Sequence, residues 1–230
     1  MDQYRLEDDN LVNNGIHPDN RSRIRDRENN ELSFSGGITL SYQFTNHWAL
    51  GAGLVFSNTS ISIDPQNIYA TRESGGTIAY KYNASTGYAY VTPGFNAQPA
   101  LGDSITANDA QHTIQYFSLP VGIKYKIGMG HFFITPVLGL TANFITSAKI
   151  QTEVSDGLNA ETIRINKLQG VRTFYAGVFA NVEIRLQWSN RFSIDVVPAF
   201  RSAISSISSS NVVKTYPYSF GAGLGVSYRL

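Results

Sequence analysis

Apolar and polar residues alternate with a period of two along most of the chain after Leu32. From Leu32 to Phe44 the even positions are apolar except for Gly36, and no odd position is apolar. Side chains two residues apart lie on the same face of a strand, so this pattern predicts a two-faced β-strand. Six more alternating segments follow, at 48–56, 117–127, 134–144, 174–188, 192–200 and 218–230.

The connections between these seven predicted strands are of two kinds. Short ones at 45–47, 128–131 and 189–191 alternate with long ones at 64–112, 148–171 and 205–215. Long strands with short turns at one rim and long loops at the other are typical of outer-membrane barrels, whose short turns face the periplasm. The sequence therefore predicts an all-β fold, an antiparallel up-and-down transmembrane β-barrel of about eight strands.

The barrel is expected to occupy residues 31–230. One polar segment is expected before it, and one of its long loops is expected to contain further structure. Residues 1–30 are polar with charges of mixed sign, which favours a polar N-terminal segment or extracellular loop over a binding arm. The long loop 64–112 is expected to carry its own hairpin. In it Ile78, Tyr80 and Tyr82 would face Tyr88 and Tyr90 across a turn at Asn83–Thr86.

The polar face of the strands indicates which side faces lipid. On the last strand it consists of Ser219, Gly221, Gly223, Gly225 and Ser227, whereas a solvent-exposed face would be expected to carry many Lys and Glu. Small residues fit the narrow lumen of an eight-stranded barrel. The apolar face is therefore predicted to contact lipid. A soluble barrel with its apolar face inside remains an alternative.

Charged residues on the polar face are predicted to form a lumen network. If Trp188 pairs with Phe192 across the short turn, Arg185 falls opposite Asp195, where the two charges can compensate one another. A surface salt bridge on a soluble sheet is the competing interpretation. The predicted lumen network consists of Lys124, Lys126, Glu183, Arg185, Asp195 and Arg201.

Aromatic residues gather at the strand ends near the short turns, where a membrane interface would hold their amphipathic rings. The predicted interface aromatics are Phe44, Trp48, Tyr125, Phe132, Trp188, Phe192 and Tyr228.

The strand count is odd, whereas bacterial single-chain barrels have an even number of strands. Counting back from Leu230 at the periplasmic rim leaves one strand missing before Leu32. We expect it at the N-terminus or just upstream of Met1, with Tyr4–Leu6 as its last residues and the segment 1–30 as its extracellular loop. The same position would explain why no signal sequence is visible.

The composition excludes several classes of function and site. Charged residues make up 15% of the chain, against roughly a quarter in an average soluble domain. The net charge of +1 gives no case for nucleic acid. The absence of cysteine excludes disulfides, thiolate metal sites and cysteine nucleophiles.

Two segments resemble the outer-membrane protein β-barrel domain family, Gram-negative barrels similar in architecture to the OmpA and OmpX type. They are the run from Tyr116 to Lys126 and the ending from Gly221 to Leu230. The resemblance covers roughly 32–230 and implies eight strands and assembly by the outer-membrane barrel machinery. Such barrels usually end in an aromatic residue. Leu230 departs from that pattern and leaves Tyr228 as the nearest aromatic.

No catalytic, metal or cofactor site is predicted. The four histidines lie at positions without metal-ligand spacing. His112 near Asp109 and Ser118 is the one catalytic candidate, and a solvated loop histidine is the favoured interpretation. The Gly-rich stretches alternate with apolar residues, so they are strand positions and not phosphate-binding loops.

The sequence therefore predicts a non-enzymatic protein of the cell outer membrane with a structural role or a loop-mediated interaction role. A narrow transport pore and a soluble apolar-in barrel that binds a hydrophobic ligand are the alternatives. Outer-membrane lipid and the barrel-assembly machinery are the expected partners, together with an extracellular or periplasmic protein. No nucleic acid is expected.

Overall fold

The fold is all-β, as predicted. The structure, a computed structural model, describes residues 2–7, 27–209 and 214–229. Most of the predicted polar segment 1–30 lies outside these ranges. The one helix among the described residues is the 3-10 turn η1 (Gly94–Asn96), and no helix there is long and apolar enough to cross a membrane.

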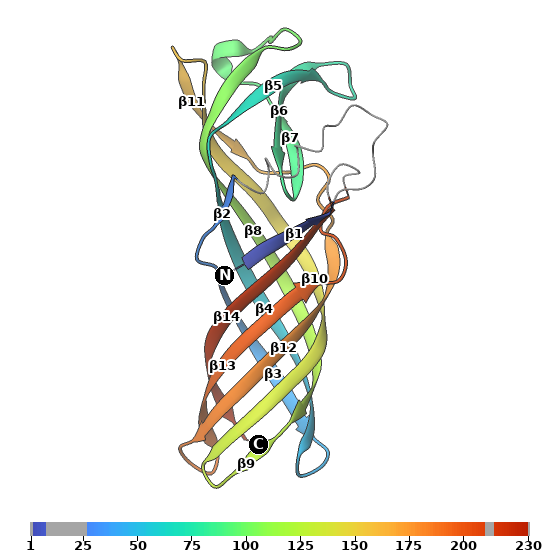
Figure 1. The fold of residues 1–230 in the computed structure, drawn as a ribbon, viewed down its shortest axis with the longest axis vertical. Helices are drawn as coiled ribbons and strands as arrows, with labels where there is room; N and C mark the ends of the chain where they lie inside the picture. The colour runs from blue at the N-terminus through green and yellow to red at the C-terminus, as the bar shows by residue number, and fades with distance from the viewer. Residues whose placement is uncertain (1, 8–26, 210–213, 230) are drawn as a thin grey trace.

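The seven strands expected from the alternation are all present, and most of them are longer than expected (Figure 1). They are β3 (Phe34–Gln43), β4 (Trp48–Ile63), β8 (Ser104–Tyr125), β10 (Phe132–Ser155), β12 (Phe174–Gln187), β13 (Phe192–Ala203) and β14 (Lys214–Tyr228). An eighth, β1 (Asp2–Glu7), contains Tyr4–Leu6 and pairs antiparallel with β14.

These eight strands form one antiparallel sheet in the order β1-β14-β13-β12-β10-β8-β4-β3. The expected full closure is not observed in the described residues. There β1 pairs with β14 only over Lys214–Ser219, and β3 pairs only with β4. The sheet is therefore open between β3 and the lower part of β14.

The expected number of about eight strands was too low, because the described residues contain fourteen strand segments. The additional six are short and lie in the connections. They are β2 (Glu28–Asn30), β5 (Gln66–Arg72), β6 (Ile78–Ala84), β7 (Gly87–Val91), β9 (Ile127–Met129) and β11 (Ala160–Ile165). The segments 64–112 and 148–171, expected to be long loops, are thus strand for much of their length.

The hairpin expected within 64–112 is present as β6 and β7, but its register differs from the expected one. Tyr82 pairs with Ala89 and Tyr80 with Val91, so the tyrosines of the two strands do not face one another. Tyr80 and Tyr82 are buried, whereas Tyr88 and Tyr90 are half-buried on the opposite face of the hairpin.

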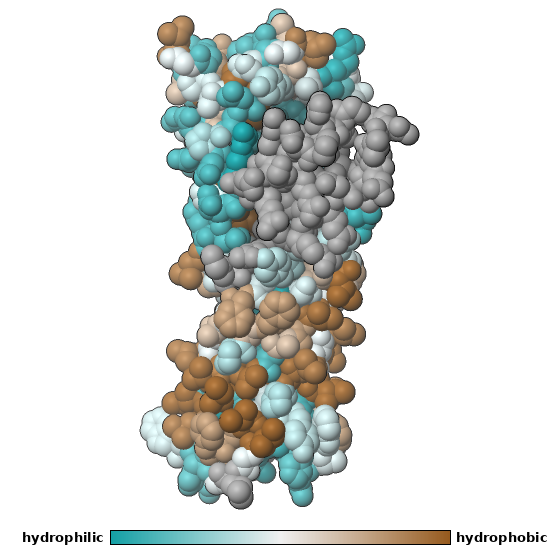
Figure 2. Space-filling view, viewed as in Figure 1, coloured by the Kyte–Doolittle hydropathy of each residue, from teal (hydrophilic) through white to brown (hydrophobic). Residues whose placement is uncertain are grey.

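The outer surface changes polarity along the long axis. We call the end with the β3–β4, β9–β10 and β12–β13 connections the turn end and the opposite end the loop end. Near the turn end the outer face is apolar, and toward the loop end it becomes polar (Figure 2). On β4 the outward residues change from Leu54 and Phe56 to Asn58 and Ser60, while the inward Ile61 is fully buried.

On β10 this inversion uses a β-bulge. The pairing with β8 shifts register between Ile145 and Ser147, which leaves Thr146 as the extra residue. Before the bulge odd-numbered residues such as Asn143 point inward, and after it even-numbered residues such as Ile150 do. Without this slip Lys149 would point into the interior instead of Ile150. The bulge therefore keeps a charge out of the core.

The loop-end strands enclose a second interior, which is apolar. The sheet order there is β11-β10-β8-β5-β6-β7, and an isolated bridge between Tyr88 and Gln169 joins its two ends. We call this part the upper compartment and the part with the apolar outer face the lower compartment. The core of the upper compartment consists of Ile63, Ile68, Ala70, Tyr80, Tyr82, Ala84, Ala89, Val91, Ile105, Ala107, Ala110, Ala148, Ile150, Val154, Ile165 and Leu168.

In the lower compartment, glycines make room for one large inward side chain. Gly122 of β8, Gly139 of β10 and Phe179 of β12 are consecutive partners across the sheet. A Cβ on Gly139 would lie 2.6 Å from the Phe179 ring and 2.3 Å from the Val121 carbonyl oxygen. Phe179 therefore packs over the two glycines and fills this part of the lumen.

We expect Gly139→Ala to lower the free energy of unfolding by about 1–3 kcal/mol, because the backbone oxygen of Val121 cannot move aside as a side chain can. Urea titration in detergent measures the loss. Gly36→Ala is the matched control, since a Cβ there meets nothing within 4 Å. An equal loss in both variants would contradict the packing argument.

Candidate functional site

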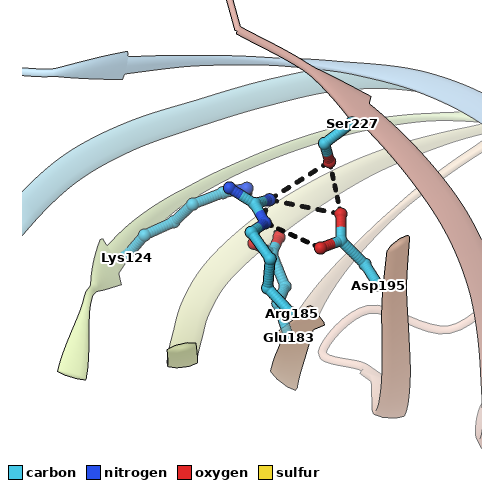
Figure 3. Close-up of polar contacts among 5 residues, drawn as sticks. All are labelled: Lys124, Glu183, Arg185, Asp195 and Ser227. Atoms are coloured by element: carbon cyan, nitrogen blue, oxygen red, sulfur yellow. Dashed lines mark hydrogen bonds and ion pairs between the residues drawn. The ribbon is translucent and has the colours of Figure 1, made fainter. Parts of the chain in front are cut away.

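Five polar side chains from four strands form a continuous cluster inside the lower compartment (Figure 3). The lumen cluster consists of Lys124 of β8, Glu183 and Arg185 of β12, Asp195 of β13 and Ser227 of β14. It contains two cations and two anions, so its charges balance.

The pairing of Arg185 with Asp195 is present in the register expected from the short turn. The Arg185 Nε donates to Asp195 Oδ1 at 2.7 Å, and Nη2 donates to Oδ2 at 3.2 Å. Ser227 donates its hydroxyl to Asp195 and accepts a hydrogen bond from Arg185 Nη2. Asp195 is buried, and this bidentate geometry is a strong form of the ion pair.

Lys124 joins the cluster from across β10. Its Nζ lies 2.6 Å from Glu183 Oε1, while Glu183 Oε2 lies 3.6 Å from Arg185 Nη2. A Cβ on Gly51 would lie 2.6 Å from the Lys124 Cε, so this glycine leaves room for the lysine stem. Glu183 therefore links the two cations, a contact that strand register alone did not predict.

The other two predicted lumen residues lie outside the cluster. The Lys126 Nζ is 4.0 Å from the centroid of the Phe133 ring near the turn end. Arg201 lines two small cavities of about 100 and 40 Å³. All six predicted residues therefore belong to the polar face, but only four of them contact one another.

All seven predicted interface aromatics are exposed on the outer surface. Trp48 and Tyr125 pack edge to face with centroids 4.8 Å apart, and Phe192 packs against Tyr228 at 5.1 Å. A second outward row, of phenylalanines nearer the loop end, was not predicted. It crosses four adjacent strands at Phe56, Phe117, Phe144 and Phe174.

The tip of the β6–β7 hairpin is buried between the two compartments. The Ser85 N–H donates to Glu28 Oε1 at 2.8 Å, and Thr215 donates its hydroxyl to the Ser85 carbonyl oxygen. Thr86 Oγ1 lies 3.3 Å from His112 Nε2. The hairpin tip is therefore held by β2, β8 and β14 at once.

His112 was expected to be a solvated loop histidine, and this expectation was wrong. Its side chain is fully buried between Ile61 and Ile150 of the neighbouring strands, and its Nδ1 has no hydrogen-bond partner. Burial lowers its pKa to about 4. Ser118 instead donates to Asn143 Oδ1 at 2.6 Å, so the candidate group of His112, Asp109 and Ser118 is not assembled.

Glu28 is another titratable side chain that contacts the hairpin tip. Its partial burial raises the pKa of the carboxyl group, against the opposing effect of the hydrogen bond from Ser85. Nothing in the tip resembles a metal site. Across residues 2–7, 27–209 and 214–229 no group of three or more His, Asp or Glu side chains could hold a metal ion.

An antiparallel sheet with an apolar outer band and a polar, charge-balanced interior is typical of outer-membrane β-barrels. The family model described as "Outer membrane protein beta-barrel domain" matches residues 10–230, and the chain belongs to this family. No curated protein matches the sequence.

Proposed function

We propose that this protein is a non-enzymatic outer-membrane barrel that presents the upper compartment to a partner outside the cell. In this proposal the lower compartment anchors the protein in lipid, with the turn end toward the periplasm. The upper compartment is the part that makes the interaction.

The inversion of polarity along shared strands carries this proposal. On β10 the outward Leu138 and Leu140 are 68% and 62% exposed, which is favourable in lipid and costly in water. Beyond the bulge, the outward positions of the same strand include Lys149 and Glu153. A membrane that ends near the bulge would satisfy both halves of the strand.

The apolar-in alternative does not describe the lower compartment, because the apolar residues of β3, β4, β8 and β10 are outward there. It describes the upper compartment, whose interior is apolar. Several features favour a structural role over a transport pore. The lumen cluster pairs its charges, Phe179 fills part of the lumen, and the hairpin tip lies between the compartments.

Site-specific labelling tests the orientation, and the absence of native cysteine makes it clean. Leu158→Cys lies at the exposed β10–β11 turn, and Asn190→Cys lies at the β12–β13 turn. A maleimide that is too large to cross the outer membrane should label the protein in whole cells only at position 158. Labelling at 190 alone would refute the orientation.

Purified protein tests the remaining parts of the proposal. We expect heat-modifiable gel mobility in detergent, aggregation without detergent, and no steady conductance in a planar bilayer. A steady single-channel conductance would favour the pore instead.

A further inference from the structure

We propose that a basic surface at the loop-end edge of the apolar outer band binds the phosphate headgroup of an anionic lipid. This inference rests on the proposed function, because it requires that the lower compartment lie in lipid. The basic surface consists of Lys149, Arg164, Lys167 and Arg172, all of which are exposed. It lies on β10, on β11 and on the segment that connects β11 with β12.

Two phenylalanines mark the place where the apolar band ends on β10 and β12. Phe144 and Phe174 are partners across the sheet, both are exposed, and their ring centroids are 5.3 Å apart. Toward the turn end the outward residues of β10 include Leu138 and Leu140. A lipid whose acyl chain packs along these side chains would therefore have its headgroup just beyond the two rings.

Arg172 lies directly beyond the ring of Phe174, which it precedes by two residues. The N–H of Ile145 donates to the carbonyl oxygen of Thr173 at 2.8 Å, and this hydrogen bond holds the segment beside β10. The guanidinium of Arg172 is exposed and can donate two hydrogen bonds to one phosphate. It is therefore placed where a headgroup phosphate would lie.

Lys149 lies beyond Phe144 on the outer face, because the bulge at Thr146 shifts the outward positions to odd numbers. Four strand steps of about 3.3 Å, on a strand tilted by about 40°, place it roughly 10 Å farther along the membrane normal. The headgroup layer is about 5–8 Å deep on each side of a bilayer. A lysine stem can lie along the protein surface and bring its ammonium group into that layer.

The charge of the basic surface is not balanced by acidic residues nearby. Residues 144–152 and 162–174 contain no Asp or Glu, and the residue opposite Lys149 on β8 is Thr113. Within the described parts of the chain, none of the four cations has an ion-pair partner. A cation near an anionic lipid surface contributes roughly fivefold in affinity. Four cations together therefore favour an anionic lipid over a zwitterionic one.

The position of the basic surface favours a lipid over a free phosphate ion. The two ligands share the same anionic chemistry, but a free ion makes no use of the exposed apolar residues that adjoin Lys149 and Arg172. A lipid contacts both parts at once, with its acyl chain on the band and its phosphate on the cations. We therefore assign the surface to a lipid headgroup.

The test uses the full chain in micelles of a neutral detergent. Phosphatidylglycerol, which carries a net negative charge, is the anionic probe, and phosphatidylcholine with the same acyl chains is the zwitterionic comparison. We expect native mass spectrometry to show that phosphatidylglycerol is bound at least tenfold more tightly. Raising the salt concentration from 0.1 to 1 M should weaken this preference, because the screening length falls from about 10 to about 3 Å.

Charge variants of the basic surface supply the second arm. We expect Lys149→Glu/Arg172→Glu to abolish the preference for phosphatidylglycerol, whereas Lys149→Arg/Arg172→Lys keeps both charges and should bind as the native protein does. Arg72→Glu reverses an exposed cation of β5 outside the basic surface and should change nothing. Heat-modifiable gel mobility verifies that each variant is folded.

Each contrary result overturns the inference in a recognisable way. Equal binding of the two lipids by the native protein would mean that the apolar band alone holds lipid. A preference that survived in Lys149→Glu/Arg172→Glu would assign it to other residues, and displacement of phosphatidylglycerol by an equal concentration of inorganic phosphate would make a free ion the ligand. Lipid binding in micelles does not depend on membrane orientation, so its failure is distinct from failure of the labelling test.

Discussion

Replacing Asp195 with leucine is expected to lower the free energy of unfolding by about 3 kcal/mol, because it leaves Arg185 inside the lumen without its bidentate partner. Glu183 lies 3.6 Å from the same guanidinium and compensates only part of the charge. Urea titration of the protein in lipid vesicles, followed by the fluorescence of Trp48 and Trp188, measures the loss.

The double variant Arg185→Met/Asp195→Leu is the matched control. It removes both charges and leaves the ion pair of Lys124 with Glu183 in place, so we expect a stability within about 1 kcal/mol of the native protein. If the double variant were as unstable as Asp195→Leu alone, the loss would reflect packing and not an unpaired charge.

The upper compartment is expected to lose about 3 kcal/mol of stability as the pH falls from 6.5 to 4, because His112 is buried in its neutral form. Its pKa is about 4 in the folded protein, against 6.5 when solvated. Between these values the unfolded chain binds the proton and the folded chain does not. The contribution is therefore fully present above pH 6.5 and is lost on acidification.

Hydrogen exchange at the amides of Ile61 and Ile150, corrected for intrinsic rates, measures this change beside the imidazole. We expect His112→Leu to remove the loss, whereas His131→Gln at an exposed turn should leave it intact. Glu28 acts in the opposite direction, because its raised pKa stabilises the folded state as the pH falls. A loss that persisted in His112→Leu would assign it to another group.

The lower compartment could be predicted from sequence because its determinants are local. A period of two identifies each strand, and a three-residue turn fixes the register of its neighbours. The pairing of Arg185 with Asp195 follows from these two facts alone. Register also explains the exposed Trp48 and Tyr125, which lie directly opposite one another.

The upper compartment was not predicted because its strands continue those of the lower compartment, with apolar residues on the inner face and polar residues on the outer face. After Phe56 the alternation of β4 goes on through Ile61 and Ile63, but the apolar residues now occupy odd positions. On β10 the inward positions change from odd to even numbers at Thr146, so no single alternating pattern covers the whole strand. A search for alternation that changes phase could have found both.

Contacts between segments far apart in the chain could not be predicted from the sequence. His112 contacts Thr86, which a separate hairpin brings to it. The link between Lys124 and Glu183 spans β10, and the lysine stem occupies the space next to Gly51. Neither periodicity nor turn length contains this information.

The two longest strands connect the compartments without a linker. β8 has 22 residues and β10 has 24, and each runs from the lipid-facing band into the apolar core of the upper compartment. A hinge between the compartments would have to bend both strands at once. A contact made at the loop end would therefore be held at a constant height and angle relative to the apolar outer band.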